Sequence, residues 1–62
     1  MLGNLKGEIA RAIRVLGPDQ GEMQNVLDIK CWLSTGYITS DEADVLREYN
    51  RNLAKSLRDD ES

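Results

Sequence analysis

The sequence contains no histidine, and it has one cysteine. Without an imidazole, the commonest general base near neutral pH is missing, and Cys31 has no such neighbour to activate it as a nucleophile. One cysteine without histidine also provides too few soft ligands for a zinc or iron–sulfur site. Phosphate-binding loops, dinucleotide fingerprints and EF-hand spacings are missing as well. We therefore expect a non-enzyme that needs no metal and no cofactor.

Long apolar runs are also missing. No stretch has the length and hydropathy of a membrane span, and the first residues do not combine a charged region with an apolar signal core. A lone cysteine within an apolar stretch is typical of a reduced thiol that packs as a small hydrophobic residue. We expect a soluble, cytoplasmic protein in which Cys31 is packed.

Aromatic residues are scarce, and the chain is short. Its 62 residues allow one domain, and the aromatic side chains are those of Trp32, Tyr37 and Tyr49. A core of this size supplies roughly 3–5 kcal/mol of net stability, and small domains commonly add disulfides, a metal or self-association. Because the first two are excluded, the composition favours self-association.

Only the start of the chain has a net positive charge. The net charge is +2 for residues 1–17, −2 for residues 18–36 and −3 for residues 37–62, which together give the formal −3 of the chain. An isoelectric point near 4.7 argues against broad binding to phosphate backbones, which requires clustered Lys and Arg.

The hydrophobic periodicity predicts a first amphipathic helix over residues 3–16. Its apolar residues recur at spacings of three and four, at Leu2, Leu5, Ile9, Ala12, Ile13 and Leu16. Gly17 and Pro18 then form a stop signal, since glycine can adopt the left-handed conformation that ends a helix and proline can begin the next one. We expect Asp19, or a residue beside it, to cap the second helix, with Glu22 as a capping-box-like partner.

The second helix, ending near Thr35, is predicted to be the central one. Its apolar residues cover well over half of a helical wheel: Met23, Val26, Leu27, Ile29, Cys31, Trp32 and Leu33. A helix that is apolar most of the way round sits between other elements. We therefore expect both of its sides to be covered, with Gly36 as the residue that ends it.

The third helix is predicted over residues 40–58. Thr39 and Glu42 form a T-x-x-E capping box, and Ile38 with Ala43 forms a hydrophobic staple. The fold class expected is all-α, with three short helices of which the second and third form an antiparallel hairpin, completed as a homodimeric helical bundle. We expect one domain over 1–58 and a frayed acidic tail over 59–62.

Asn50 lies within the 3-4 spacing of the third helix, which runs through Ala43, Leu46, Asn50, Leu53 and Leu57. This spacing is typical of a seam between two helices. Asn50 has two interpretations: it lies at the rim of a stripe that passes through Tyr49, or it sits inside a homo-oligomeric seam and fixes the register by pairing with its symmetry mate.

These features favour a small regulatory or adaptor protein that binds another protein through a helical surface, as a homodimer. The apolar faces exceed what a chain this short covers comfortably, and Trp and Tyr are enriched at interface hot spots. The predicted interface anchors are Trp32, Tyr37, Leu46, Tyr49, Asn50 and Leu53.

Two alternatives remain open. Cationic residues recur along one side of the third helix and could contact nucleic acid, at Arg47, Arg51, Lys55 and Arg58, although Asp44 and Glu48 offset them. The second alternative is that the chain is a structural component of a phage-like assembly. In size and helical class the chain is similar to small plasmid- and phage-encoded regulators, but no family motif is present.

Overall fold

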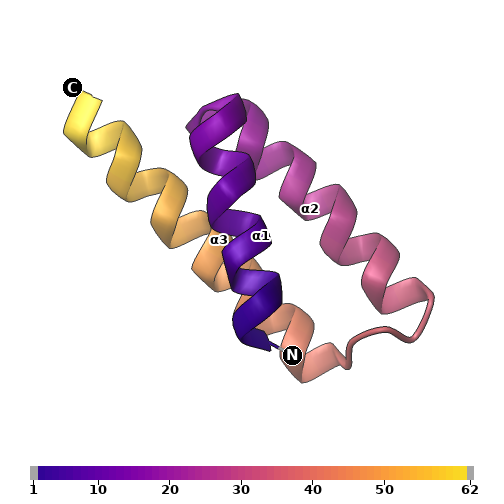
Figure 1. The fold of residues 1–62 in the computed structure, drawn as a ribbon. Helices are drawn as coiled ribbons and strands as arrows, with labels where there is room; N and C mark the ends of the chain where they lie inside the picture. Colours follow the sequence, from indigo (N-terminus) through magenta and orange to yellow (C-terminus); the bar gives the residue numbers. More distant parts are fainter. Residues whose placement is uncertain (1, 62) are drawn as a thin grey trace.

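The computed structural model describes residues 2–61 and consists of three helices, α1 (Leu2–Leu16), α2 (Pro18–Ser34) and α3 (Ser40–Glu61), with no strand among these residues. Each helix packs against the other two. Figure 1 shows that α2 runs antiparallel to both α1 and α3, to which it is joined by short turns. The predicted all-α fold with an α2–α3 hairpin is therefore confirmed, and the homodimer stays a prediction.

The turn between α1 and α2 consists of one residue. Gly17 has a φ of 91°, and its N–H donates to the carbonyl of Ile13 at 2.9 Å. Pro18 is the first residue of α2, and Gly17 occupies the N-cap position without any side-chain cap. The predicted cap at Asp19 is wrong, because the fixed φ of Pro18 begins the helix before Asp19.

The turn between α2 and α3 follows the predicted signals. Gly36 adopts a φ of 79°, and Tyr37 N–H donates to the Trp32 carbonyl at 2.8 Å. The capping box is formed in both directions: Thr39 N–H donates to Glu42 Oε1 at 2.8 Å, and Glu42 N–H donates to Thr39 Oγ1 at 3.2 Å. Helix α3 continues to Glu61, three residues beyond the predicted end at residue 58; residue 62 of the predicted tail lies outside the described residues.

The core lies where the three helices meet. It contains the predicted stripe of α1 and small residues of α3 that allow close packing, and its buried apolar members are Leu5, Ile9, Ile13, Ile29, Ile38, Ala43, Leu46 and Ala54. Leu16, predicted in the same stripe, is 44% exposed at the end of α1.

Helix α2 contacts both neighbours, as expected for a central helix. It buries much less apolar surface than its sequence predicted. Its buried residues are Gly21, Asn25 and Ile29. Met23 and Leu27 are 69% and 56% exposed, and Val26 is also exposed. Cys31 is exposed too, so the prediction of a packed thiol is wrong. The reason is geometric: two antiparallel neighbours cover only one side of α2, and that side carries Gly21, Asn25 and Ile29.

Gly21 is the point of closest approach between α1 and α2. A Cβ atom at this position would lie 2.5 Å from Ile13 Cα and 2.8 Å from the Ala12 carbonyl oxygen. Any side chain here would therefore meet the backbone of α1, which cannot turn away as a flexible side chain could. Glycine lets the two helices touch.

Two buried asparagines connect all three helices. Asn25 and Asn50 are 2% and 1% exposed. Asn25 Nδ2 donates to the Ile9 carbonyl of α1 and to Asn50 Oδ1 of α3, both at 2.9 Å, and Asn50 Nδ2 donates to the Glu22 carbonyl at 3.1 Å. Asn50 is therefore not a rim residue. The partner of its amide is Asn25 of the same chain, and not the Asn50 of a second copy that the other interpretation required.

Candidate protein-binding site

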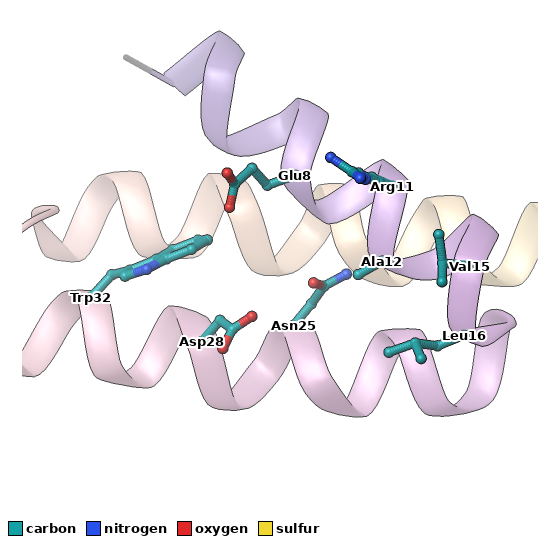
Figure 2. A pocket seen from close by; sticks show the side chains of 8 residues that line it. All are labelled: Glu8, Arg11, Ala12, Val15, Leu16, Asn25, Asp28 and Trp32. Atoms are coloured by element: carbon teal, nitrogen blue, oxygen red, sulfur yellow. The ribbon is translucent and has the colours of Figure 1, made fainter.

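A groove of about 360 Å³ opens between α1 and α2. Figure 2 shows the Trp32 ring extending from α2 at one end of the groove and Leu16 at the other, with the Asn25 amide between the two helices. Ala12 and Val15 line the α1 side, and Val15 is 72% exposed. The groove therefore offers an apolar strip that the chain itself does not cover.

Charged groups surround this apolar strip. Glu8 and Arg11 lie on the α1 side, and Asp28 lies on the α2 side. Asp28 Oδ1 accepts a hydrogen bond from Gln24 Nε2 at 3.1 Å, and the ion pairs found among residues 2–61 do not include Arg11 or Glu8. A ligand in the groove would thus meet apolar side chains along its middle and both signs of charge at its edges.

Trp32 and Tyr37 are the predicted anchors that lie nearest an open surface. The Trp32 ring is half-buried, packs on the core and also lines the groove. Its centroid is 6.5 Å from that of Tyr37, with the planes tilted by 52°, and Tyr37 is exposed. Tyr37 is therefore an exposed aromatic neighbour of Trp32, but it does not line the groove.

The other four predicted anchors belong to the interior or its margin. Leu46 and Asn50 are buried within the single chain. Tyr49 and Leu53 are partly buried against the core, and Lys6 Nζ lies 5.4 Å from the Tyr49 ring centroid. The structure therefore does not bring the six residues together as one surface. The four that belong to α3 lie on or beside the stripe with which this helix packs on the core.

Sequence reasoning missed the exposed apolar residues Val15, Leu16, Met23, Val26 and Leu27. Val15 gave a signal, since it falls outside the 3-4 stripe of α1 and an apolar residue off the stripe must face solvent or a partner. The residues of α2 gave none, because its apolar residues surround the helix and the wheel does not say which side faces inward.

The cationic row of α3 is partly neutralised. Arg47 pairs with Asp44 at 3.3 Å. Arg58 donates from Nε to Asp19 at 2.8 Å and from Nη2 to Glu22 at 2.5 Å. These hydrogen bonds, that of Glu22 first, raise the pKa of the Arg58 guanidinium above its ordinary value. Arg51 and Lys55 remain without an ion pair among the described residues.

Residues 2–61 hold no cluster of three side chains suited to binding a metal ion. Within the same range, no helix has the length and hydropathy needed to cross a membrane. Searches against protein-family models, curated proteins and solved structures find no match to this chain.

Proposed function

We propose that this chain is a small, non-enzymatic regulatory or adaptor protein that binds another protein through the α1–α2 groove. The observation that carries the proposal is the apolar strip between Trp32 and Leu16, which stays open after the three helices have formed their core. Amphipathic helices commonly bind such grooves with their apolar side.

The charges around the groove define the partner. Its apolar side would pack on Val15, Leu16 and Trp32, while an acidic group beside Arg11 and a basic group beside Asp28 would complete the contact. The complementary ligand is therefore an amphipathic helix with an apolar stripe between one acidic and one basic edge. Trp32 is the expected hot spot, because its ring is rigid and already held by the core.

The test is selection of helical peptides against the immobilised chain, followed by titration of the best binder into the labelled protein and observation of the amide resonances. Binding at the groove shifts resonances of α1 and α2 around Ala12 and Asp28. Val15→Asp should weaken binding at least about ten-fold, as expected when a charge enters an apolar contact. The matched control is Val45→Asp, which alters an exposed valine of α3 outside the groove. Equal loss with both variants, or failure to select a binder, would contradict the proposal.

Nucleic-acid binding through α3 is the alternative function, and it rests on Arg51 and Lys55. Two unpaired cations are few, given the acidic chain and the pairing of Arg47 and Arg58. Binding of duplex DNA or structured RNA that weakens steeply with salt and is lost in Arg51→Gln would support this alternative. A role in a phage-like assembly would instead produce open-ended oligomers.

A further inference from the structure

The side of α2 that faces away from the core is apolar. Met23, Leu27 and Cys31 follow one another at a spacing of four, so they form one stripe along the helix, and Val26 borders this stripe on the side toward α3. We call these four residues the outward face of α2. All four are exposed, and the groove described above does not include any of them.

The residues beside the outward face have little charge. Gln20, Gln24 and Ser34 are exposed, uncharged side chains on the same side of the helix. Depletion of charge around an apolar centre is characteristic of the buried part of protein interfaces. The outward face therefore has the composition of an interface core, which is unusual for the exposed side of a helix in a protein with 31% charged residues.

The remaining charges are opposite at the two ends of the face. At the N-terminal end, Asp19, Glu22 and Arg58 form a cluster whose formal charge is −1. At the C-terminal end lies Lys30, which is exposed and has no ion pair among residues 2–61. A second α2 in antiparallel orientation sets each positive end against a negative end, whereas a parallel one sets like charges together.

We propose that the occupant of the outward face is a second copy of this chain, packed antiparallel through α2 about a two-fold axis near residue 25. That axis places Met23 of each copy against Leu27 of the other. Each Lys30 then lies level with Gln20 of the other copy, within a turn of Asp19 and Glu22. The contact is isologous and closes as a dimer, and the antiparallel helix dipoles also favour it.

Cys31 reports the orientation of the two copies. In the antiparallel pair the two Cys31 residues are twelve positions apart along the helix axis, about 18 Å at a rise of about 1.5 Å per residue. A disulfide requires Cα atoms within about 7 Å of each other, so oxidation cannot join them. In a parallel pair the two thiols would face each other.

The first test is the solution mass of the purified chain by light scattering after size exclusion, over a wide concentration range. The expected mass is twice the 7.0 kDa of one chain at high concentration. Leu27→Asp should abolish the dimer while leaving the helical circular dichroism unchanged, because Leu27 is outside the core. A mass of one chain at every concentration would overturn the proposal and leave the outward face for a different protein.

The second test separates the two orientations. Lys30→Glu should raise the dissociation constant of the dimer about ten-fold in the antiparallel arrangement, since two attractions become repulsions. In a parallel arrangement the two Lys30 residues lie beside each other, so the substitution replaces a pair of positive charges by a pair of negative charges and the dissociation constant changes little. A dimer insensitive to Lys30→Glu, or one that oxidation joins through Cys31, would overturn the antiparallel orientation. The groove proposal is independent: Val15→Asp should leave the dimer mass unchanged.

Discussion

The two faces of α2 do not divide apolar from polar residues as those of an ordinary amphipathic helix do. The fully buried part of the inward face is a glycine, an asparagine and an isoleucine, and the partly buried Trp32 and Leu33 pack on the core beyond them. The outward face carries Met23, Val26, Leu27 and Cys31. A helix that packs by bulk would place these larger apolar residues inside. The first half of α2 instead packs by close approach at Gly21 and by hydrogen bonds from Asn25, and apolar packing begins only at Ile29.

This difference shows that the inward face depends on shape and on satisfied polar groups. Every buried side-chain nitrogen or oxygen among the described residues has a hydrogen-bond partner. Because an unsatisfied buried amide is costly, the Asn25–Asn50 pair stabilises only the helix arrangement in which both amides meet. The outward face has no such role within the single chain. Substitutions on the two faces of α2 should therefore differ greatly in their cost.

The largest effect is expected for Gly21→Ala. Its Cβ would lie 2.5 Å from Ile13 Cα, so α1 and α2 must separate. We expect a loss of at least about 2 kcal/mol in the free energy of unfolding, a large part of the stability of a domain this small. Urea unfolding followed by circular dichroism measures it.

Gly7→Ala in α1 is the matched control for Gly21→Ala. An added Cβ at Gly7 meets nothing within 4 Å. This variant should gain about 1 kcal/mol from helix propensity. Equal effects of the two substitutions would show that the helices do not depend on contact at Gly21.

The second-largest loss of stability is expected for Asn25→Leu. It removes the donor to the Ile9 carbonyl and to Asn50 Oδ1, which leaves both acceptors buried without that bond. We expect a loss of about 2 kcal/mol in the free energy of unfolding. The double variant with Asn50→Leu should cost about 1 kcal/mol less than the sum of the single variants, because it removes both partners. Additive costs in a double-mutant cycle would contradict the coupling of the two amides.

The sequence was sufficient to predict the three helices and the two turns between them, apart from the cap at Asp19 and the last residues of α3. Gly17-Pro18, Gly36 and the box between Thr39 and Glu42 are local signals, and their conformations depend on neighbouring residues alone. The α1 stripe through Leu5, Ile9 and Ile13 was equally clear, because it has one apolar side. These parts of the fold follow from short-range chemistry.

The orientation of α2 could not be predicted in the same way. Its apolar residues lie all around the helix, so which side faces inward depends on the contact of Gly21 with Ile13 and on Asn25 meeting Asn50, twenty-five residues away. Neither contact leaves a periodic signal. The spacing of α3 likewise suggested Leu46 and Asn50 as interface anchors although both are buried. Of the groove residues, Leu16 was placed in the core stripe of α1 and Val15 was given no role.

A smaller loss of stability is expected when the ion pairs of Arg58 with Asp19 and Glu22 are removed. These pairs join the end of α3 to the start of α2. Arg58→Gln should increase amide hydrogen exchange in the last turns of α3 and leave the core protected, because the cluster lies at the surface. Since the pKa of Arg58 is raised, its contribution is present below the ordinary guanidinium pKa and is lost only in strong alkali. The ratio between the protection factors of Arg58→Gln and the unsubstituted chain should therefore be the same from about pH 6 to about pH 9. Arg51→Gln removes an arginine that has no ion pair within the described part of the chain, so it should not change the exchange.

The smallest effect is expected for Met23→Gln on the outward face. Met23 is 69% exposed and outside the core, so the free energy of unfolding, measured at a concentration where the chain is monomeric, should change by less than about 0.5 kcal/mol. The same substitution should weaken the dimer, because it puts an amide against Leu27 of the second copy. A loss of stability in the monomer comparable to that of Asn25→Leu would mean that Met23 supports the fold of the single chain. The contrast between the two faces of α2 would then fail.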